Sequence, residues 1–208
     1  MTLDMKNLLQ SIMESMDRIE YIKADDIPNI DLYMDQVTTF MDAKLKNTTR
    51  NPKEDKVLTK TMINNYAKND LLPPPVKKKY TKEHVLLLIF IYYYKGVLSI
   101  NDIQTLLSPI TKDFFGKEGD LDLASVYEEI FQLEKPEVEC MKKDVMDKFA
   151  LAGQTFTDVA DDKREELQLF TFIGLLGFDV YVKKLLIEKM LDGYRELLEE
   201  EKKGKDKK

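Results

Sequence analysis

Residues 57–103, which read VLTKTMINNYAKNDLLPPPVKKKYTKEHVLLLIFIYYYKGVLSINDI, decide the fold. The first part, 57–70, predicts a short helix with Thr59 as its N-cap and a hydrophobic staple between Leu58 and Ile63. At 100° per residue the side chains of this helix separate into two faces that do not interleave. The apolar face holds Met62, Ile63, Tyr66 and Ala67, and the polar face holds Lys60, Thr61, Asn64, Asn65 and Lys68. We therefore expect the helix to dock through one side only.

The polar face of this helix offers ammonium groups, a hydroxyl and side-chain amides, which can reach phosphates and base edges in a DNA major groove. Three prolines then stiffen the chain at 73–75 before the adjacent lysines Lys77, Lys78 and Lys79. Residues 53–84 carry 8 Lys/Arg and 4 Asp/Glu, net +4, so the rest of the chain carries 24 against 34, net −10. The positive charge is therefore local, which suits binding at this patch rather than general coating of nucleic acid.

The stretches NDLLPPPVKKKYTKEH and KGVLSINDIQTLL give a family resemblance. In order and spacing, Thr59–Leu107 resembles the DNA-binding domain of MerR-type winged-helix regulators. There a recognition helix is followed by a Leu-Leu pair, a basic wing that ends in tyrosine, here Tyr80, a Ser/Thr-capped helix and a turn into a fourth helix. Asp70 stands where those regulators usually have glycine, and aspartate tolerates a left-handed conformation better than most residues. The whole chain resembles a family of uncharacterised bacterial proteins, classed as a domain of unknown function, with this MerR-like core.

Composition bounds the class of protein. At 208 residues the chain suits one domain or two small ones. Cys140 is the single cysteine, so neither a disulfide framework nor a Cys-rich metal site is available, which favours a reducing cytosol. Residues 1–20 lack the apolar core of a signal peptide. The most apolar stretch, 167–182, is shorter than the roughly 20 residues that a bilayer needs. We expect a cytoplasmic protein that makes no membrane contact.

Upstream of the central stretch, residues 4–22 have helical apolar spacing, and Asp31 is the expected N-cap of a second helix that reaches residue 45. By its order in the chain, this second helix is the scaffold helix of a helix-turn-helix. Residues 46–56 are all polar or proline, which predicts a loop. Because an ordinary turn has only three or four residues, either a mobile loop covers the DNA side or the first helix is wrongly assigned. We favour the loop.

Downstream, Thr81 caps a helix that is apolar on every side from Val85 to Tyr94, and Gly96 is expected to end it in a left-handed C-cap. Ser99 and Asp102 resemble a capping box. That box opens a short helix, with Ile100, Ile103 and Leu107 inward, that ends at Pro109. After this helix we expect a loop at 110–120 and three further helices at 121–133, 137–151 (opened by Pro136) and 161–200. Gly174 and Gly177 predict a bend or a close helix contact in the last of these. Residues 202–208 are expected to be an unpacked tail.

No residue pattern in the chain points to catalysis. His84 is the only histidine and has no second ligand nearby in sequence, so we expect a surface or packing residue. No Gly-rich phosphate loop precedes a Lys-Ser/Thr pair. The carboxylate pairs at 25–26 and 161–162 precede helices, where they favour the free amides. We expect no enzyme activity, no catalytic or metal-binding residue and no cofactor.

The sequence thus predicts an all-α protein. Its parts are an N-terminal amphipathic helix (1–28), a MerR-like winged helix-turn-helix (29–110), a helical dimerisation or regulatory part (121–200) and a disordered tail (201–208). The predicted function is sequence-specific double-stranded DNA binding by a transcriptional regulator with an effector of unknown identity. Bases would be read by Thr61, Asn64 and Asn65, and phosphates would be bound by Lys60, Lys68, Lys77, Lys78 and Lys79. Tyr80, which closes the wing, is also predicted to belong to the DNA-binding surface. The alternative is a helical protein-interaction module that keeps the scaffold without DNA binding.

The last helix carries an apolar stripe that predicts a homodimer. Its period does not hold a strict heptad through the two glycines, which indicates packed helices rather than a regular coiled coil. A two-fold protein also suits a palindromic site. The alternative is that this helix folds back and completes a monomeric core. The stripe consists of Leu167, Phe170, Ile173, Phe178, Tyr181, Leu185 and Leu191.

Overall fold

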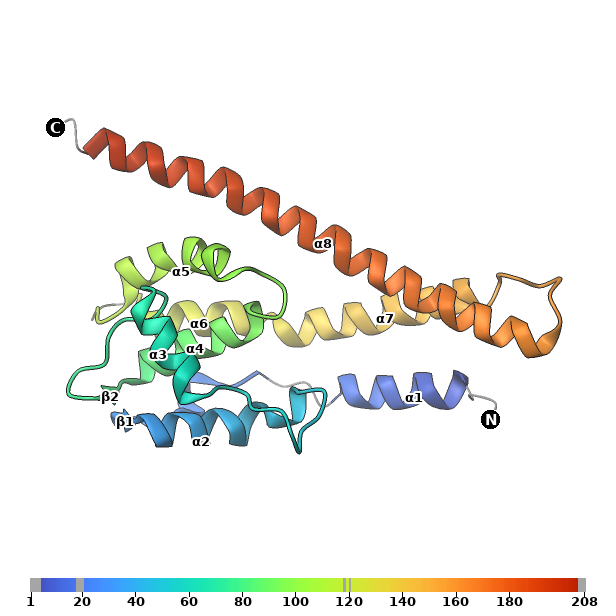
Figure 1. The fold of residues 1–208 in the computed structure, drawn as a ribbon, viewed down its shortest axis with the longest axis horizontal. Helices are drawn as coiled ribbons and strands as arrows, with labels where there is room; N and C mark the ends of the chain where they lie inside the picture. Colours follow the sequence, from blue (N-terminus) through green and yellow to red (C-terminus); the bar gives the residue numbers. More distant parts are fainter. Residues whose placement is uncertain (1–4, 18–20, 118, 120, 206–208) are drawn as a thin grey trace. The chain divides into compact units, whose positions relative to one another are not determined.

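The computed structural model describes residues 5–17, 21–117, 119 and 121–205. It is mostly helical, which confirms the all-α class (Figure 1). The chain forms two compact units: unit 1 comprises Met1–Tyr21 and Gln132–Leu186, and unit 2 comprises Ile22–Phe131 and Ile187–Lys208. The elements of unit 1 are α1 (Met5–Met16), α7 (Glu134–Ala152) and the first part of α8 (Asp161–Lys205). Those of unit 2 are η1 (Ala24–Asp26), β1 (Leu32–Tyr33), α2 (Met34–Leu45), η2 (Lys46–Thr48), α3 (Lys60–Lys68), β2 (Lys79–Tyr80), α4 (Lys82–Tyr94), α5 (Ile100–Phe114), α6 (Leu123–Phe131) and the last part of α8.

The core of unit 2 forms around α4. Every side chain from His84 to Ile91 is buried, as predicted for a helix that lacks a polar face. Phe90 contacts Tyr127 of α6, with ring centroids 5.4 Å apart, and the Tyr127 hydroxyl donates to the Ile22 carbonyl at 2.6 Å. Each fully buried large apolar side chain contributes roughly 1.5–3 kcal/mol, so α4 is the main source of stability in this unit.

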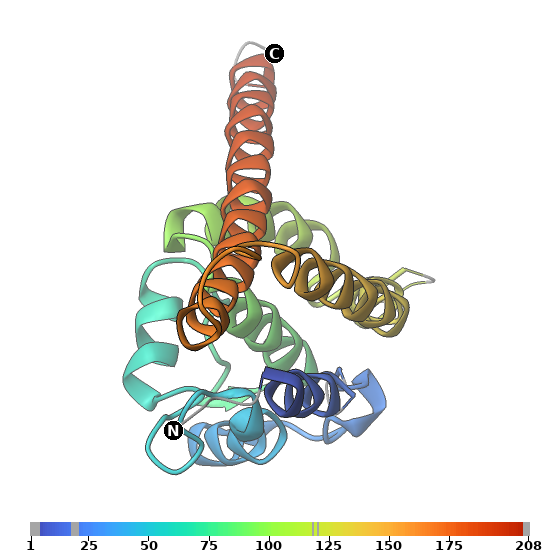
Figure 2. The same cartoon turned by 90° about the vertical axis from the view of Figure 1, so that its right-hand side faces the viewer.

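The helices α2 and α3 are in contact in unit 2 and run in different directions, and α2 also contacts a two-stranded sheet (Figures 1 and 2). The strands β1 and β2 pair antiparallel, with Leu32 opposite Tyr80. Residues 32–33 are therefore extended, and α2 begins after an N-cap at Tyr33, so the predicted N-cap at Asp31 is wrong. The Tyr33 amide donates to the Gln36 carboxamide oxygen at 2.8 Å. The apolar side chains of Val37, Met41 and Leu45 in α2 are buried.

Unit 1 has a smaller core. Leu9 of α1, Ala152 of α7 and Phe172 of α8 are buried together, and the Phe172 ring meets Phe149 edge to face at 5.4 Å. Lys142 of α7 forms an ion pair with Asp17. The predicted helix at 4–22 is shorter, because α1 ends at Met16; residues 4 and 18–20 lie outside the described part of the chain.

Two predicted helix ends are wrong. The helix α5 passes through Pro109 and ends at Phe114, so the expected loop at 110–120 starts later. Proline removes only one helical hydrogen bond, and buried Ile103 and Leu107 hold the helix, whereas Ile100 is exposed rather than inward. The helix α4 has a right-handed C-cap at Lys95, and the positive-φ glycines in the described residues are Gly116 and Gly119, not Gly96.

The last helix, α8, also differs from prediction. It is continuous from Asp161 to Lys205, so 202–205 are helical, and the remaining tail residues 206–208 lie outside the described part of the chain. A Cβ added at Gly174 or Gly177 would meet nothing within 4 Å, so no close helix contact explains these glycines. Among the described residues, no helix is long and apolar enough to cross a membrane.

Candidate nucleic-acid interface

The ends of α3 are fixed by local hydrogen bonds. At the start, the Thr59 hydroxyl accepts from the Met62 amide at 3.1 Å, as predicted for an N-cap. At the end, Asp70 takes the left-handed conformation with φ 54°, which aspartate tolerates better than most residues. The Leu71 amide then donates to the Tyr66 carbonyl at 2.9 Å, which is the six-to-one bond of a Schellman-type end, and the Leu72 amide donates to the same carbonyl at 3.2 Å.

The two predicted faces of α3 are separated in the structure. Ile63 and Tyr66 are buried and Met62 and Ala67 half-buried, while Lys60, Thr61, Asn64, Asn65 and Lys68 are exposed. Within unit 2, Lys60 forms an ion pair with Asp35 of α2, and both side chains remain largely exposed. Such a pair contributes at most about 1 kcal/mol, so Lys60 is held beside α2 rather than removed from solvent.

The three lysines after the prolines form a tight turn. Val76 pairs with Lys79, whose amide donates to the Val76 carbonyl at 2.9 Å. Lys77 and Lys78 occupy the two central positions with φ 50° and 63°. Positive φ at both positions is the geometry of a type I′ turn, which normally uses Asn-Gly. Lysine there costs roughly 1–2 kcal/mol per residue, and strain of this kind is a pointer to function.

The residues at the base of this turn are less available than those at its tip. Lys77 and Lys78 are exposed, whereas Lys79 is half-buried with its Nζ 5.6 Å from the Tyr33 ring centroid. Tyr80 is 2% exposed and packs edge to face on His84 at 5.5 Å. The sequence placed Tyr80 in the binding surface, but its ring is a core contact that fixes the wing, defined here as residues 73–80, to α4.

His84 is buried at the start of α4. Its Nδ1 accepts from the Thr81 amide at 3.0 Å and lies 2.8 Å from the Thr81 hydroxyl, so in the neutral ring the proton sits on Nε2. Burial lowers the pKa of His84, although the nearby carbonyls of Pro74 and Pro73 oppose this. Of the two predicted roles, surface or packing, the structure shows packing.

The predicted loop, 46–56, contains η2 and turns and no α-helix. Its C-terminal end is fixed at Val57: the Val57 amide donates to the Asp42 carboxylate at 3.3 Å, and Lys95 Nζ donates to the Val57 carbonyl at 2.7 Å. Burial lowers the pKa of Lys95. No local sequence pattern points to Asp42 or Lys95 here, because their contacts with Val57 cross 15 and 38 positions, respectively.

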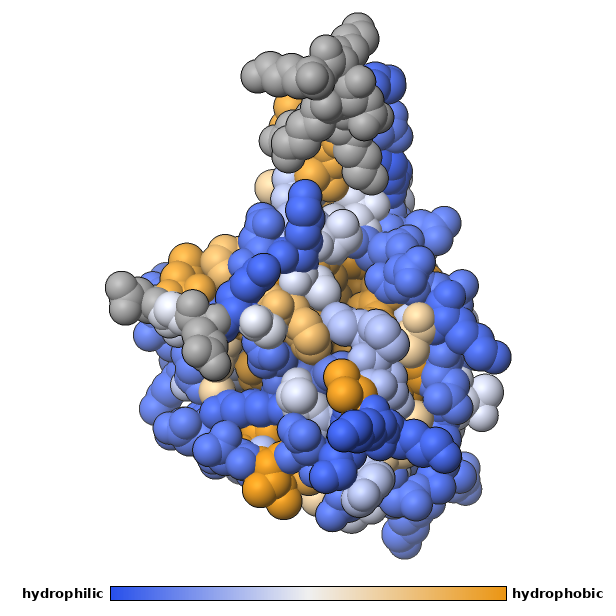
Figure 3. All heavy atoms as spheres, turned by 90° about the vertical axis from the view of Figure 1, so that its left-hand side faces the viewer, coloured by the Kyte–Doolittle hydropathy of each residue, from blue (hydrophilic) through white to orange (hydrophobic). Residues whose placement is uncertain are grey.

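The surface that carries the wing is mainly hydrophilic, with separate apolar spots (Figure 3). A groove of about 450 Å³ lies elsewhere on unit 2, along α2, and its lining is mostly apolar, with Ile30, Leu32 and Phe40 among its residues. In the part of the chain that the structure describes, no cluster of three or more His, Cys, Asp or Glu side chains has the arrangement of a metal site.

One protein family matches the first segment of unit 2. Residues 22–130, more than half of the chain, match the family described as Domain of unknown function (DUF1836). The chain belongs to the DUF1836 family. This match coincides with the first segment of unit 2, Ile22–Phe131, so the DUF1836 domain contains α2, α3, the wing and α4. Searches of the curated proteins and of the solved structures gave no match.

Proposed function

We propose that this DUF1836 protein is a transcriptional regulator that binds double-stranded DNA sequence-specifically through a MerR-like winged helix-turn-helix. The observation that carries the proposal is the combination, in one unit, of an exposed polar face on α3 and an exposed, strained lysine turn. Both lie in the basic stretch of an otherwise acidic chain, so they form the surface best suited to an anionic partner.

Each exposed group has a role in this proposal. Thr61, Asn64 and Asn65 read base edges, since hydroxyl and amide groups hydrogen-bond to bases in the major groove. Lys77 and Lys78 at the wing tip contact phosphates, as do Lys60 and Lys68 of α3 and, to a lesser degree, the half-buried Lys79. No chemical step is assigned to the protein, and its compartment is proposed to be the cytoplasm.

The second candidate is a protein-interaction module on the same scaffold. The groove along α2 favours it, because Ile30 in its lining is largely exposed. The pairing of Lys60 with Asp35 also removes part of the positive charge of α3. In this case the lysine turn would meet an acidic protein surface instead of phosphates.

Selection from random duplex DNA separates the two candidates. The proposal requires enrichment of a defined motif, and its binding constant should fall with salt at a slope of roughly −0.9 per phosphate contacted. The double variant Lys77→Ala/Lys78→Ala should weaken binding to all duplexes and make the slope less steep by about 2. Lys135→Ala/Lys143→Ala, at exposed positions of α7 in unit 1, removes the same charge and should change neither quantity. No enrichment by the native chain would favour the interaction module.

We also propose that α8 forms a homodimer contact. Within unit 1, α8 leaves Phe170, Ile173, Phe178, Tyr181 and Leu185 exposed. At 100° per residue these five lie on one side of the helix. The other two predicted stripe residues differ, since Leu167 is half-buried and Leu191 is buried. A second copy would cover this face and present two α3 helices to a two-fold site.

A further inference from the structure

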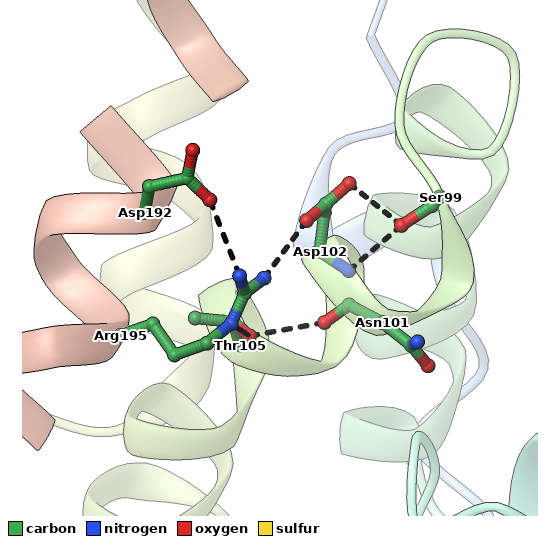
Figure 4. A network of polar contacts seen from close by, with 6 residues as sticks. All are labelled: Ser99, Asn101, Asp102, Thr105, Asp192 and Arg195. Carbon is green, nitrogen blue, oxygen red and sulfur yellow. Dashed lines mark hydrogen bonds and ion pairs between the residues drawn. The ribbon is translucent and has the colours of Figure 1, made fainter. Parts of the chain in front are cut away.

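Arg195, in the last part of α8, binds α5 (Figure 4). Arg195 donates from Nη2 to the Asp102 carboxylate at 3.0 Å and from Nε to the Thr105 hydroxyl at 3.4 Å. Its Nη1 is held by Asp192 of α8 itself, at 3.2 Å. The Asp102 side chain is only 19% exposed and that of Arg195 is 40% exposed, so the contact is partly shielded from water.

Hydrogen bonds at the start of α5 hold the Asp102 side chain in place for this contact. The Ser99 hydroxyl donates to the Asp102 carboxylate at 2.6 Å and accepts from the Asp102 amide at 3.2 Å, which caps the helix (Figure 4). The Ser99 hydrogen bond, and then Arg195, hold the pKa of Asp102 below its ordinary value. The Thr105 hydroxyl in turn donates to the Asn101 carbonyl at 3.0 Å. Arg195 thus binds the first turns of α5 at two points.

The same turns of α5 also hold the end of α3. Gln104 donates from its side-chain amide to the Asn69 carbonyl at 3.1 Å. Asn69 is the C-cap of α3, with its own amide bonded to the Asn65 carbonyl, and it directly precedes left-handed Asp70. Gln104 therefore connects α5 to the point where the chain leaves the proposed recognition helix for the wing.

We propose that Arg195 is a positioning residue for DNA binding: it fixes α5, and through Gln104 it fixes the C-terminal end of α3. This inference rests on the proposed function for its effect on DNA, but not for its effect on the protein alone. Arg195 is committed to contacts within unit 2, so it acts on binding only through the order that it gives to α3.

Amide hydrogen exchange of the full chain without DNA tests the first part. Arg195→Met keeps the apolar stem and removes the donors. We expect the exchange rates of the Asn69, Leu71 and Leu72 amides to rise about 2- to 5-fold, because that is the change in local opening expected when a half-exposed ion pair is lost. The exchange rates of amides in the middle of α4 should stay unchanged. Arg195→Lys should restore part of the protection, and Gln104→Met should give the same rise. Arg164→Met, the same substitution in unit 1, should have no effect on these amides.

Duplex binding tests the second part. Arg195→Met should weaken binding about 2- to 5-fold with an unchanged salt slope, because no phosphate contact is lost. A reduced slope would make Arg195 a direct phosphate contact and overturn the proposal. Unchanged exchange at 69–72, or an equal rise throughout unit 2, would also overturn it. If the native chain binds no duplex at all, the proposed function fails, while the exchange result still decides whether Arg195 orders α3.

Discussion

The helices α4 and α8 are both rich in apolar residues, but they differ in how far those side chains are buried. In α4 every residue from His84 to Ile91 is buried. In α8, which is more than three times as long, Phe172 and Leu191 are the only buried residues among the described side chains. Phe170 and Phe178 of α8 are 74% and 67% exposed.

The difference shows that apolar content alone does not say which helix stabilises a domain. An apolar side chain contributes only when other elements of the fold cover it. The sheet and helices of unit 2 surround α4, whereas the described residues of unit 1 leave one face of α8 exposed. Stability should therefore depend on α4, and association on α8.

The largest expected effect is in α4. Leu87→Ala should lower the free energy of unfolding of unit 2 by about 2–5 kcal/mol, because it removes fully buried methyl groups and leaves a cavity. Urea unfolding followed by the near-UV signal of the tyrosines measures it, since all of them except Tyr21 and Tyr181 lie in unit 2. Leu186→Ala, at an exposed position of α8, should change the value by less than about 0.5 kcal/mol. Equal losses in both variants would contradict the comparison.

A charge on the exposed face of α8 should affect association but not folding. We expect the native chain to scatter light as a dimer, with twice its 24.3 kDa mass. Phe178→Glu should return it to a monomer, since losing one buried phenyl ring costs roughly 1.5–3 kcal/mol, or at least about tenfold in Kd.

The matched control is Leu186→Glu, which puts the same charge at an exposed position on another side of α8 and should leave the dimer intact. A native mass of 24.3 kDa would refute the homodimer and remove the reason for an extended palindromic site.

The smallest effect should come from acidification, and it should act on the start of α4. Because burial lowers the pKa of His84, the unfolded chain takes up the proton more readily than the folded chain. The free energy of unfolding should therefore decline as pH falls below about 6.5, the ordinary value, and level off below the folded pKa. Charging Nδ1 would also break its bond with the Thr81 amide.

His84→Gln isolates this effect, because glutamine is a normal capping-box partner at this helix position and does not titrate. The urea midpoint of the native chain should fall more between pH 7.5 and 5.5 than that of the variant. Parallel curves for the two proteins would show that His84 is not responsible.

Much of the central stretch was predictable because its signals are local. The Thr59 cap, the two faces of α3, left-handed Asp70 and the buried run of α4 each depend on residues within one or two helical turns. Where a prediction failed, a distant partner or the wider packing decided. Asp31 is not the N-cap of α2, because its neighbour Leu32 is extended and pairs with Tyr80, 48 positions away. Tyr80 is not part of the exposed surface for the same reason, because its pairing with Leu32 and its contact with His84 place its ring in the core.

The sequence by itself determined the helical class, the polar face of α3 and the local excess of lysines, because periodicity and charge are properties of short segments. Tertiary structure alone decided that Lys77 and Lys78 form the tip of a type I′ turn, that Lys95 holds Val57 and that Arg195 binds α5 beside the end of α3. The contacts of Lys95 and Arg195 join residues 38 and 93 positions apart, and only the packed core brings them within hydrogen-bonding distance. The lysine turn leads into β2, whose pairing with β1 is a tertiary contact. The same packing left one face of α8 uncovered, a property that the spacing of its apolar residues does not contain.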